Sequence, residues 1–229
     1  MKINDLFGIE GKIAVISGGS RGIGEMIAAG FLANGVKVYI TARKGRELHL
    51  KAEELSNTYG GECISIASDL SSLDGIKAFA DEIKDKEEHI DFLINNAGAA
   101  WAEPFGAISE GGWAKVMDLN VKSIFFLTQE LAPLLRVKGT IDDPSRIINI
   151  GSIDGMNVAA FETYSYGASK AAVHHLTRQL AKRLIDENIL VNGIAPGPFP
   201  SNMLGAAVAH DYSEIAKRNP RKRIGTPQD

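Results

Sequence analysis

The chain has 229 residues, of which 45% are apolar and 23% are charged, and its formal net charge is −3. This size and apolar content suit one hydrophobic core, so we expect residues 1–229 to form a single domain. The weakly acidic balance gives no electrostatic reason to expect a nucleic-acid partner, and no apolar run is long enough for a membrane span. The first residues lack a secretory signal pattern and the single cysteine, Cys63, cannot form an internal disulfide, which favours a cytoplasmic location.

Short runs rich in Ile and Val alternate with segments whose apolar residues recur at helical spacing. Six runs predict strands: "KIAVISGG", "VKVYITA", "ECISIASD", "IDFLINNAG", "RIINIGS" and "ILVNGIAPG". Ile23, Ile27 and Phe31 recur at helical spacing after the first run and predict a helix, as Val173, Leu176 and Leu180 do later in the chain. Repeated strand–helix–strand units with right-handed crossovers predict a parallel sheet covered on both faces, which is a doubly wound α/β fold.

The first strand ends in a glycine-rich turn, "SGGSRGIG", where we expect the helix after it to begin. Ligands of doubly wound sheets bind at the carboxyl ends of the strands. Glycines there allow a pyrophosphate to approach the backbone, and the helix N-terminus then meets its charge. A tight strand-to-helix turn without a ligand is the alternative. The position of this turn at the end of the first strand of a parallel sheet favours nucleotide binding.

The second strand ends in "TARK", where a cofactor with a free ribose 2′-hydroxyl would normally meet an acidic residue. Arg43 and Lys44 stand there instead, and Arg21 lies inside the glycine turn. Cations that converge on this place suit a 2′-phosphate, which favours NADP(H) over NAD(H). Solvated loop cations are the alternative, and Lys44 fits that alternative better than Arg43.

Polar residues also follow the remaining strands. Asp69 could accept a hydrogen bond from an adenine amino group, or it could cap the helix that follows. "NNAG" offers a backbone that can pass close to a ribose, although it could be a plain turn. Ser152 ends the fifth run, and "APGPF" ends the sixth with a rigid turn that has few donors. These residues predict a crevice at the carboxyl edge of the sheet.

In "TYSYGASKAA", Tyr166 and Lys170 are four residues apart in a predicted helix, so their side chains share one face. An ammonium at that spacing can stabilise a phenolate, and Tyr166 is therefore the candidate acid. Tyr164 fails the same test because Ala168 lies four residues after it. An amphipathic helix with a half-buried tyrosine and a solvated lysine is the alternative.

Six motifs together resemble, in order and spacing, those of the classical short-chain dehydrogenase/reductases, over essentially the whole chain. They are "SGGSRGIG", "NNAG", Asn120 in "DLNV", Ser152 in "NIGS", the Tyr166 and Lys170 pair, and "APG". The resemblance implies a Rossmann-type sheet and an enzyme that transfers hydride with NADP(H). We predict these cofactor-binding residues: Gly18, Ser20, Arg21, Gly22, Ile23, Gly24, Arg43, Asp69, Leu70, Asn96, Ala97, Gly98, Tyr166, Lys170, Pro196 and Gly197.

Four residues match the family's catalytic positions, and the resemblance implies a role for each. Tyr166 is the general acid of reduction, and Ser152 hydrogen-bonds the substrate oxygen. Lys170 favours the phenolate and grips the nicotinamide ribose, while Asn120 holds a water for proton relay. A sensor or scaffold without turnover is the competing class, and such proteins usually lack the tyrosine or the lysine.

The segments "GWAKVMDLNV", "PSRIINIGS" and "APGPFPSNM" most resemble 3-oxoacyl-thioester reductases, including the branch of rhamnolipid synthesis. Reductases of other alcohols, sugars and steroids share these motifs. The motif positions predict a mostly apolar substrate pocket, with ordinary loop packing as the alternative. Its candidate residues are Trp101, Met156, Phe161, Phe199, Met203 and Leu204.

After "RIGTPQD" the family continues for roughly another helix and a seventh strand, so we expect a truncated sheet whose sixth strand is an apolar edge. The resemblance implies a homodimer or homotetramer for the full-length form. Lys217–Arg223 holds five cations in seven residues and reads as a solvated loop, with a carrier-protein contact as a minority alternative. His174 and His175 are adjacent on a helix and point apart, so we predict no metal site.

Overall fold

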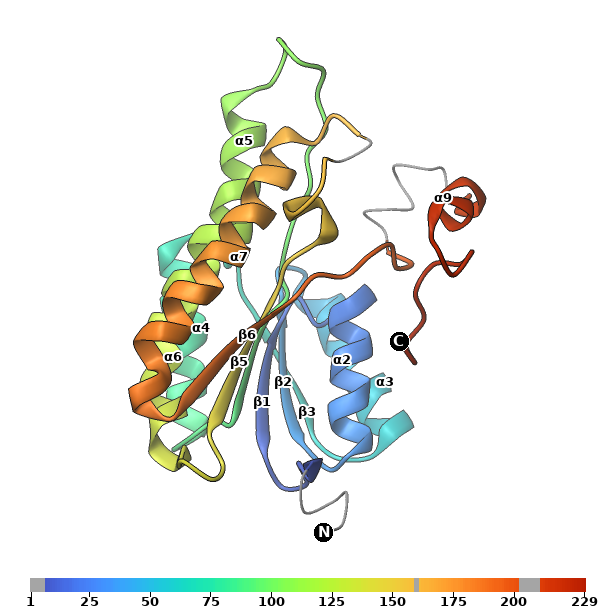
Figure 1. Cartoon of the computed structure of the whole chain (residues 1–229). Coiled ribbons are helices and arrows are strands. Elements are labelled where there is room, and N and C mark those ends of the chain that lie inside the picture. The colour runs from blue at the N-terminus through green and yellow to red at the C-terminus, as the bar shows by residue number, and fades with distance from the viewer. Residues whose placement is uncertain (1–6, 159–160, 202–210) are drawn as a thin grey trace.

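A computed structural model describes residues 7–158, 161–201 and 211–229 of the protein. Six parallel strands form one sheet in the order β3-β2-β1-β4-β5-β6, which confirms the predicted sheet (Figure 1). The strands are β1 (Ile13–Ser17), β2 (Lys37–Ala42), β3 (Cys63–Ala67), β4 (Phe92–Asn95), β5 (Ser145–Ile150) and β6 (Ile189–Ile194). The order reverses between β1 and β4, and ligands of doubly wound sheets bind at such a switch point.

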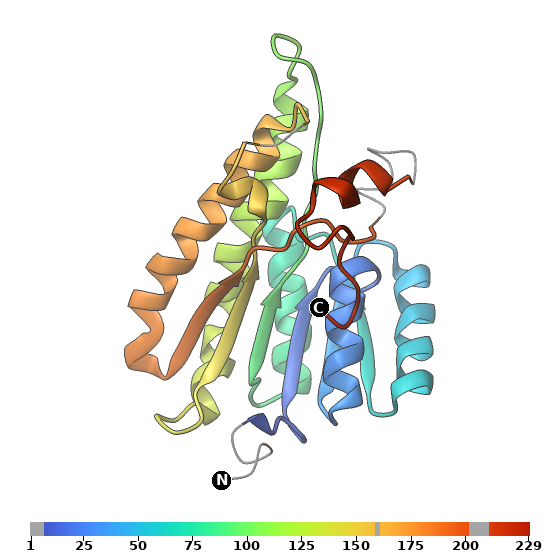
Figure 2. The ribbon, with the colours of Figure 1, turned by 45° about the vertical axis from the view of Figure 1, so that its right-hand side comes forward.

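Helices cover both faces of the sheet, as Figures 1 and 2 show. One face carries α2 (Gly22–Ala33) and α3 (Gly45–Tyr59). The other carries α4 (Leu73–Lys86), α6 (Ser123–Lys138) and α7 (Tyr164–Leu184). The short helices are α5 (Glu110–Met117) and α9 (Ser213–Arg218). Within the described ranges, no helix has both the length and the hydropathy that crossing a membrane requires.

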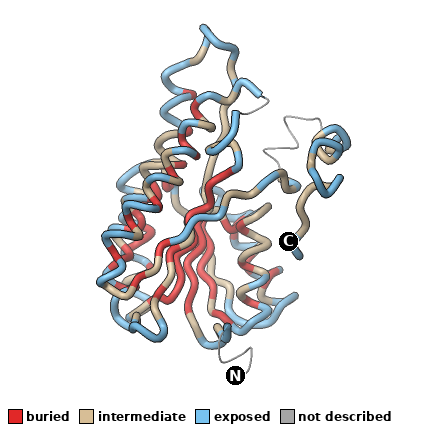
Figure 3. The backbone as a smooth tube through the Cα atoms, viewed as in Figure 1, coloured by how far each residue is buried: buried red, intermediate tan, exposed pale blue. Residues whose placement is uncertain are grey.

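Buried residues run along the strands, and the core divides into one cluster on each side of the sheet (Figure 3). The helix predicted from Ile23, Ile27 and Phe31 is α2. Its fully buried residues are Gly24, Ala28 and Leu32, and Ile27 and Phe31 are partly buried against the same core cluster. Because Gly24 and Ala28 are small, α2 can lie close to the turn after β1. The larger side chains of Ile27 and Phe31 lie on the sides of the helix. Phe31 packs there against Phe92, with ring centroids 5.0 Å apart.

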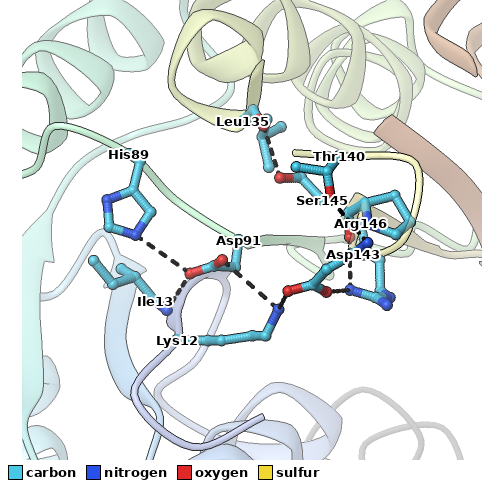
Figure 4. Close-up of polar contacts among 10 residues, drawn as sticks. Lys12, Ile13, His89, Asp91, Leu135, Thr140, Asp143, Ser145 and Arg146 are labelled. Carbon is cyan, nitrogen blue, oxygen red and sulfur yellow. Dashed lines mark hydrogen bonds and ion pairs between the residues drawn. The ribbon is translucent and has the colours of Figure 1, made fainter. Parts of the chain in front are cut away.

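An ionic network closes the amino-terminal edge of the sheet, opposite the switch point (Figure 4). Asp91, which is 9% exposed, accepts a hydrogen bond of 2.8 Å from the Ile13 backbone N–H. His89 Nε2 lies 3.7 Å and Lys12 Nζ 4.0 Å from this carboxylate. Lys12 also pairs with Asp143 in the loop before β5. The network therefore joins the starts of three neighbouring strands.

Replacing Asp91 with Ala should lower the free energy of unfolding by about 2 kcal/mol, because the buried Ile13 N–H loses its acceptor. Denaturant unfolding would measure the loss. Glu53→Ala is a matched control, since Glu53 makes only an exposed pair with His49 in the described part of the chain. We expect the control to change stability by less than about 0.5 kcal/mol. Equal stability of the Asp91 variant and the parent would contradict the prediction.

Candidate active site

The turn between β1 and α2 is built by glycines at positions where a side chain would cause backbone strain, a clash or both. Gly18 and Gly22 have positive φ angles of 70° and 59°. A Cβ placed on Gly24 would lie 2.2 Å from the Gly18 carbonyl oxygen, and one on Gly18 would lie 2.9 Å from Ala97 Cα. A Cβ on Gly22 would meet nothing closer than 3.8 Å, at Ser201. The turn is therefore packed on its inner side and roomy at Gly22, which suits a pyrophosphate.

Asn96 and Ser17 hold this turn against the end of β4. Asn96 Nδ2 donates to the carbonyl oxygens of Ser17 and Gly18, each at 3.0 Å. Ser17 Oγ accepts from the backbone N–H groups of Asn96 and Ala97, also at 3.0 Å. The structure thus brings "SGGSRGIG" and "NNAG" together, although Ser17 was not among the predicted site residues. Its hydroxyl at the start of the turn was the available signal.

Charged residues gather at the ends of β2 and β3. Arg21 and Arg43 are both exposed, and Arg43 interacts electrostatically with Asp69. Asp69 Oδ1 accepts hydrogen bonds from the Ser71 hydroxyl at 2.7 Å and from its N–H at 3.0 Å, and these bonds, with Arg43, lower the pKa of Asp69. The N-cap of α4 is Ser72, so the alternative of a cap role for Asp69 is wrong.

The structure leaves different groups of Leu70, Pro196 and Gly197 accessible to a ligand. Leu70 has its side chain in the hydrophobic core, which leaves its backbone for any ligand. Pro196 follows β6, and its carbonyl oxygen accepts from the Ile153 N–H at 3.2 Å. Gly197 faces open space, because a Cβ placed there would meet nothing within 4 Å.

Ser152, Tyr166 and Lys170 lie together at the carboxyl end of β5. Lys170 is only 5% exposed, and its Nζ donates to the Ile150 carbonyl oxygen at 2.8 Å. Its ammonium lies 5.6 Å from the centroid of the Tyr166 ring, which places the two side chains on one face of α7. Burial lowers the pKa of Lys170 to about 8. The lysine is thus a buried group, and the alternative of a solvated lysine is wrong.

Three features of its environment shift the pKa of the Tyr166 phenol. Burial raises its pKa, a hydrogen bond with Ser152 lowers it, and the negative charge of Asp154 raises it, with burial the largest cause. Asp154 was not predicted as a site residue, although an acidic residue two positions after Ser152 was a visible signal. Its own pKa is raised by burial, and its backbone N–H donates to Ser152 Oγ at 3.1 Å. Together these effects raise the pKa of Tyr166 and favour the protonated phenol.

Asn120 is fully buried in a short π-helical turn, Asp118–Lys122. Its Oδ1 accepts from the Ala99 N–H at 2.8 Å, and its Nδ2 donates to Ala99 O and to Ser169 Oγ, each at 2.9 Å. A Cβ on Gly98 would lie 3.3 Å from Asn120 Oδ1 and 3.7 Å from Lys170 Nζ. Asn120 therefore links the loop that follows β4 to α7, the helix that carries Tyr166. π-Helical turns often occur at functional sites.

A series of buried hydrogen bonds links β4, β5 and α7 beside the same region. Asn95 Nδ2 donates to Asn149 Oδ1 at 2.9 Å, and Asn149 Nδ2 donates to Thr177 Oγ1 at 3.0 Å. The Thr177 hydroxyl donates in turn to Val173 O at 2.7 Å. Sequence reasoning missed Asn149 and Thr177, because only the pairing of β4, β5 and α7 shows that these polar groups are satisfied together.

The predicted pocket residues are placed unevenly. Met156 and Phe161 are 64% and 45% exposed on the segment between Ser152 and α7. Trp101 packs instead on α5, with Lys115 Nζ 4.3 Å from its ring centroid, and Phe199 packs on Gly225. Loop packing therefore accounts for Trp101 and Phe199. Met203 and Leu204 lie outside the described residues.

The basic segment Lys217–Arg223 largely bonds to its own surroundings. Lys217 pairs with Glu214 at 2.6 Å, and Arg221 pairs with Asp229 at 2.7 Å. Arg223 also pairs with Asp229, and Lys222 Nζ donates to Lys217 O at 2.9 Å. These contacts favour the interpretation of a surface loop over that of a docking site.

Comparisons with known proteins agree with this geometry. The family model described as short chain dehydrogenase matches residues 12–211. The rhamnolipids biosynthesis 3-oxoacyl-[acyl-carrier-protein] reductase of Pseudomonas aeruginosa is 43% identical over 226 residues, which span 97% of this chain and 87% of that relative. The 7alpha-hydroxysteroid dehydrogenase of Escherichia coli is 32% identical over 99% of this chain and 86% of its own length.

Two solved structures resemble this chain in three dimensions. The P. aeruginosa RhlG/NADP active-site complex is 42% identical with a TM-score of 0.91, covering 96% of this chain and 86% of that one. The L-sorbose reductase of Gluconobacter frateurii, complexed with NADPH and L-sorbose, is 30% identical with a TM-score of 0.86, covering 96% and 87%. The similarity therefore extends over nearly all of this chain.

Proposed function

This chain belongs to the short-chain dehydrogenase family and is an NADP(H)-dependent oxidoreductase, and from that premise we propose that it reduces the ketone of a 3-oxoacyl thioester. The observation that carries the reductase chemistry is the cluster of Ser152, Tyr166 and buried Lys170 at one end of β5. The thioester is inferred from the P. aeruginosa relative, and exposed apolar side chains beside the cluster suit an acyl chain.

The proposed reaction adds a hydride and a proton to the ketone to give an alcohol. NADPH supplies the hydride when it is bound. The Tyr166 phenol gives its proton to the ketone oxygen, and the Ser152 hydroxyl donates a hydrogen bond to the same oxygen. The Lys170 ammonium stabilises the phenolate that remains after the proton has left. Asn120, whose side-chain amide bonds to Ala99 and Ser169, would hold the loop after β4 against the helix that carries Tyr166 and Lys170.

The residues present fit NADP(H). A ligand phosphate can approach the roomy side of the glycine turn, whose inner side admits no Cβ at Gly24. Arg21 and Arg43, both exposed near this turn, would hold the 2′-phosphate of the adenosine ribose. Asp69, whose charge Arg43 already stabilises, would lie near the adenine.

Replacing Arg43 with Asp should raise the Kd for NADPH by about tenfold or more and improve NADH relative to NADPH. A carboxylate repels the 2′-phosphate but accepts a hydrogen bond from a 2′-hydroxyl. Fluorescence titration with both cofactors would measure the change. Arg178→Asp makes the same charge change at an exposed position of α7, on the other face of the sheet, and should leave both constants near the parent values. If Arg43→Asp does not change the preference for NADPH over NADH, Arg21 or Lys44 must make the contact with the 2′-phosphate.

A substrate panel tests the proposed function directly. It would contain 3-oxoacyl thioesters of several chain lengths, a keto sugar and a keto steroid, with NADPH consumption followed by absorbance. We expect the thioesters to give the highest kcat/KM. A higher kcat/KM for the sugar or the steroid would replace the proposed substrate class. NADPH binding without turnover of any ketone would favour a scaffold.

We also propose that the protein works as a homodimer or homotetramer, which its resemblance to the short-chain dehydrogenases implies. Light scattering coupled to size exclusion would measure the assembly. A monomer at the concentration of the activity assay would contradict this proposal.

A further inference from the structure

His174 lies against the backbone of Ser152, and the proposed chemistry gives it no role. It follows Lys170 by one turn of α7, and its Nε2 is 3.0 Å from the Ser152 carbonyl oxygen. A carbonyl oxygen can only accept, so this contact requires the proton on Nε2. The ring therefore donates through Nε2 whether Nδ1 carries a proton or not.

Two glycines make room for the His174 ring. A Cβ placed on Gly151 would lie 2.4 Å from the ring atom Cε1, and one placed on Gly155 would lie 2.8 Å from Cδ2. A side chain at position 151 would thus push the ring away from Ser152, and one at position 155 would also meet the backbone of α7, 2.6 Å away at the Lys170 carbonyl carbon. Because both glycines flank Ser152 closely, the imidazole packs directly on the segment that carries the serine hydroxyl.

The same segment is held from two sides. Toward β6, the Gly151 N–H donates to Ile194 O at 2.7 Å, and the Ile153 N–H donates to Pro196 O at 3.2 Å. Toward α7, Lys170 binds the carbonyl oxygen of Ile150, and His174 binds that of Ser152. The Ser152 carbonyl also accepts from the Gly155 N–H at 3.0 Å. Two consecutive turns of α7 therefore grip the end of β5 on either side of Gly151.

We propose that His174 is a positioning residue: its bond to the Ser152 carbonyl fixes the serine so that its hydroxyl faces Tyr166 and the ketone. This inference rests on the proposed function. In this role the Nε2 proton stays in the bond to the Ser152 carbonyl oxygen and is not passed to the substrate. A side chain that keeps one N–H donor at the same reach should therefore replace it, and a side chain of similar bulk without a donor should not.

The test compares His174→Leu, His174→Gln, His175→Leu and Tyr166→Phe. His175 is the matched control, since it is exposed on the same helix one residue later. We expect His174→Leu to lower kcat about 10–100-fold with an unchanged Kd for NADPH, because a misplaced catalytic hydroxyl costs up to about 10²-fold. His174→Gln, whose Nε2 is the same number of bonds from Cα, should restore kcat to nearly the parent value with the parent's pH profile. His175→Leu should match the parent.

A second readout needs no turnover. The Tyr166 phenol can be titrated by absorbance, with Tyr166→Phe as the difference reference. The hydrogen bond with Ser152 lowers the pKa of Tyr166, so loosening Ser152 in His174→Leu should move this titration to higher pH, and His174→Gln should move it back. If the parent reduces no ketone, the proposed function fails, and the titration alone decides the role of His174.

Two results would overturn the inference. One is a folded His174→Leu variant with parental kcat and parental Tyr166 titration. The other is a His174→Gln variant that binds NADPH but is as impaired as His174→Leu, which would indicate that the imidazole itself is required. If His174→Leu does not fold, His174→Gln still decides, because only positioning through an N–H donor predicts parental kcat for it.

Discussion

Replacing Tyr166 with Phe is expected to lower ketone reduction by about 10²–10⁴-fold while NADPH still binds. The change keeps the ring, which packs beside the Lys170 ammonium, and removes the one proton that the proposed reaction takes from the chain. Burial and Asp154 raise the pKa of Tyr166, so the phenol is protonated at neutral pH and ready to act as an acid. Initial rates and a fluorescence titration would separate the loss of kcat from any loss of cofactor binding.

Tyr164→Phe is the matched control for this variant. Tyr164 is 43% exposed, and its hydroxyl donates to Glu162 at 3.1 Å, away from Ser152. Its ring packs on Phe105, with centroids 5.9 Å apart, and the Phe variant keeps that contact. We expect most of the activity to remain. Near-parental turnover by Tyr166→Phe would refute the proposed mechanism.

Replacing Lys170 with Met should lower kcat/KM by about 10²-fold or more and also weaken NADPH binding. Methionine fills a similar volume but leaves the Ile150 carbonyl without its 2.8 Å donor and the Tyr166 phenolate without a cation. Since burial lowers the pKa of Lys170 to about 8, the assay should be run below that pH, where the parent carries the ammonium. Steady-state kinetics and NADPH titration would report both effects.

Lys182→Met on the exposed side of the same helix controls for the loss of a charge and should behave as the parent does. Circular dichroism would show that both variants keep their helices. A folded Lys170→Met variant with parental kcat/KM and parental Kd would remove the lysine from the proposed site.

The sheet could be predicted because its strands are β-branched runs that stand apart from helical segments. Glycine was predicted to close the first strand, and β1 ends at Ser17, where Gly18 turns the chain with a φ of 70°. The spacing of Ile23, Ile27 and Phe31 predicted the helix α2. It could not show that the small residues Gly24 and Ala28 are more deeply buried, because that depends on how closely the helix approaches the turn after β1.

Some site residues could be predicted from local spacing in the sequence, and others depend on contacts between distant segments. Tyr166 and Lys170 share a helix, so their spacing alone predicted that they meet, and the structure places them together. The place of His174 depends on two glycines from another segment, which no spacing within α7 can reveal. The influence of Asp154 on Tyr166 likewise arises only when η2, the short helix Ile153–Gly155, packs beside α7.

The ionic network around Asp91 and the candidate site lie at opposite edges of the same sheet. Substitutions in the loops after the strands can therefore change substrate preference without touching the contacts that fasten the strand starts. Evolution, or a directed library confined to residues 100–109, 156–158 and 161–163, can thus explore new ketones while the contacts at the strand starts stay in place. Stabilising changes near Asp143 should combine additively with such specificity changes, since the two regions share no side-chain contact among the described residues.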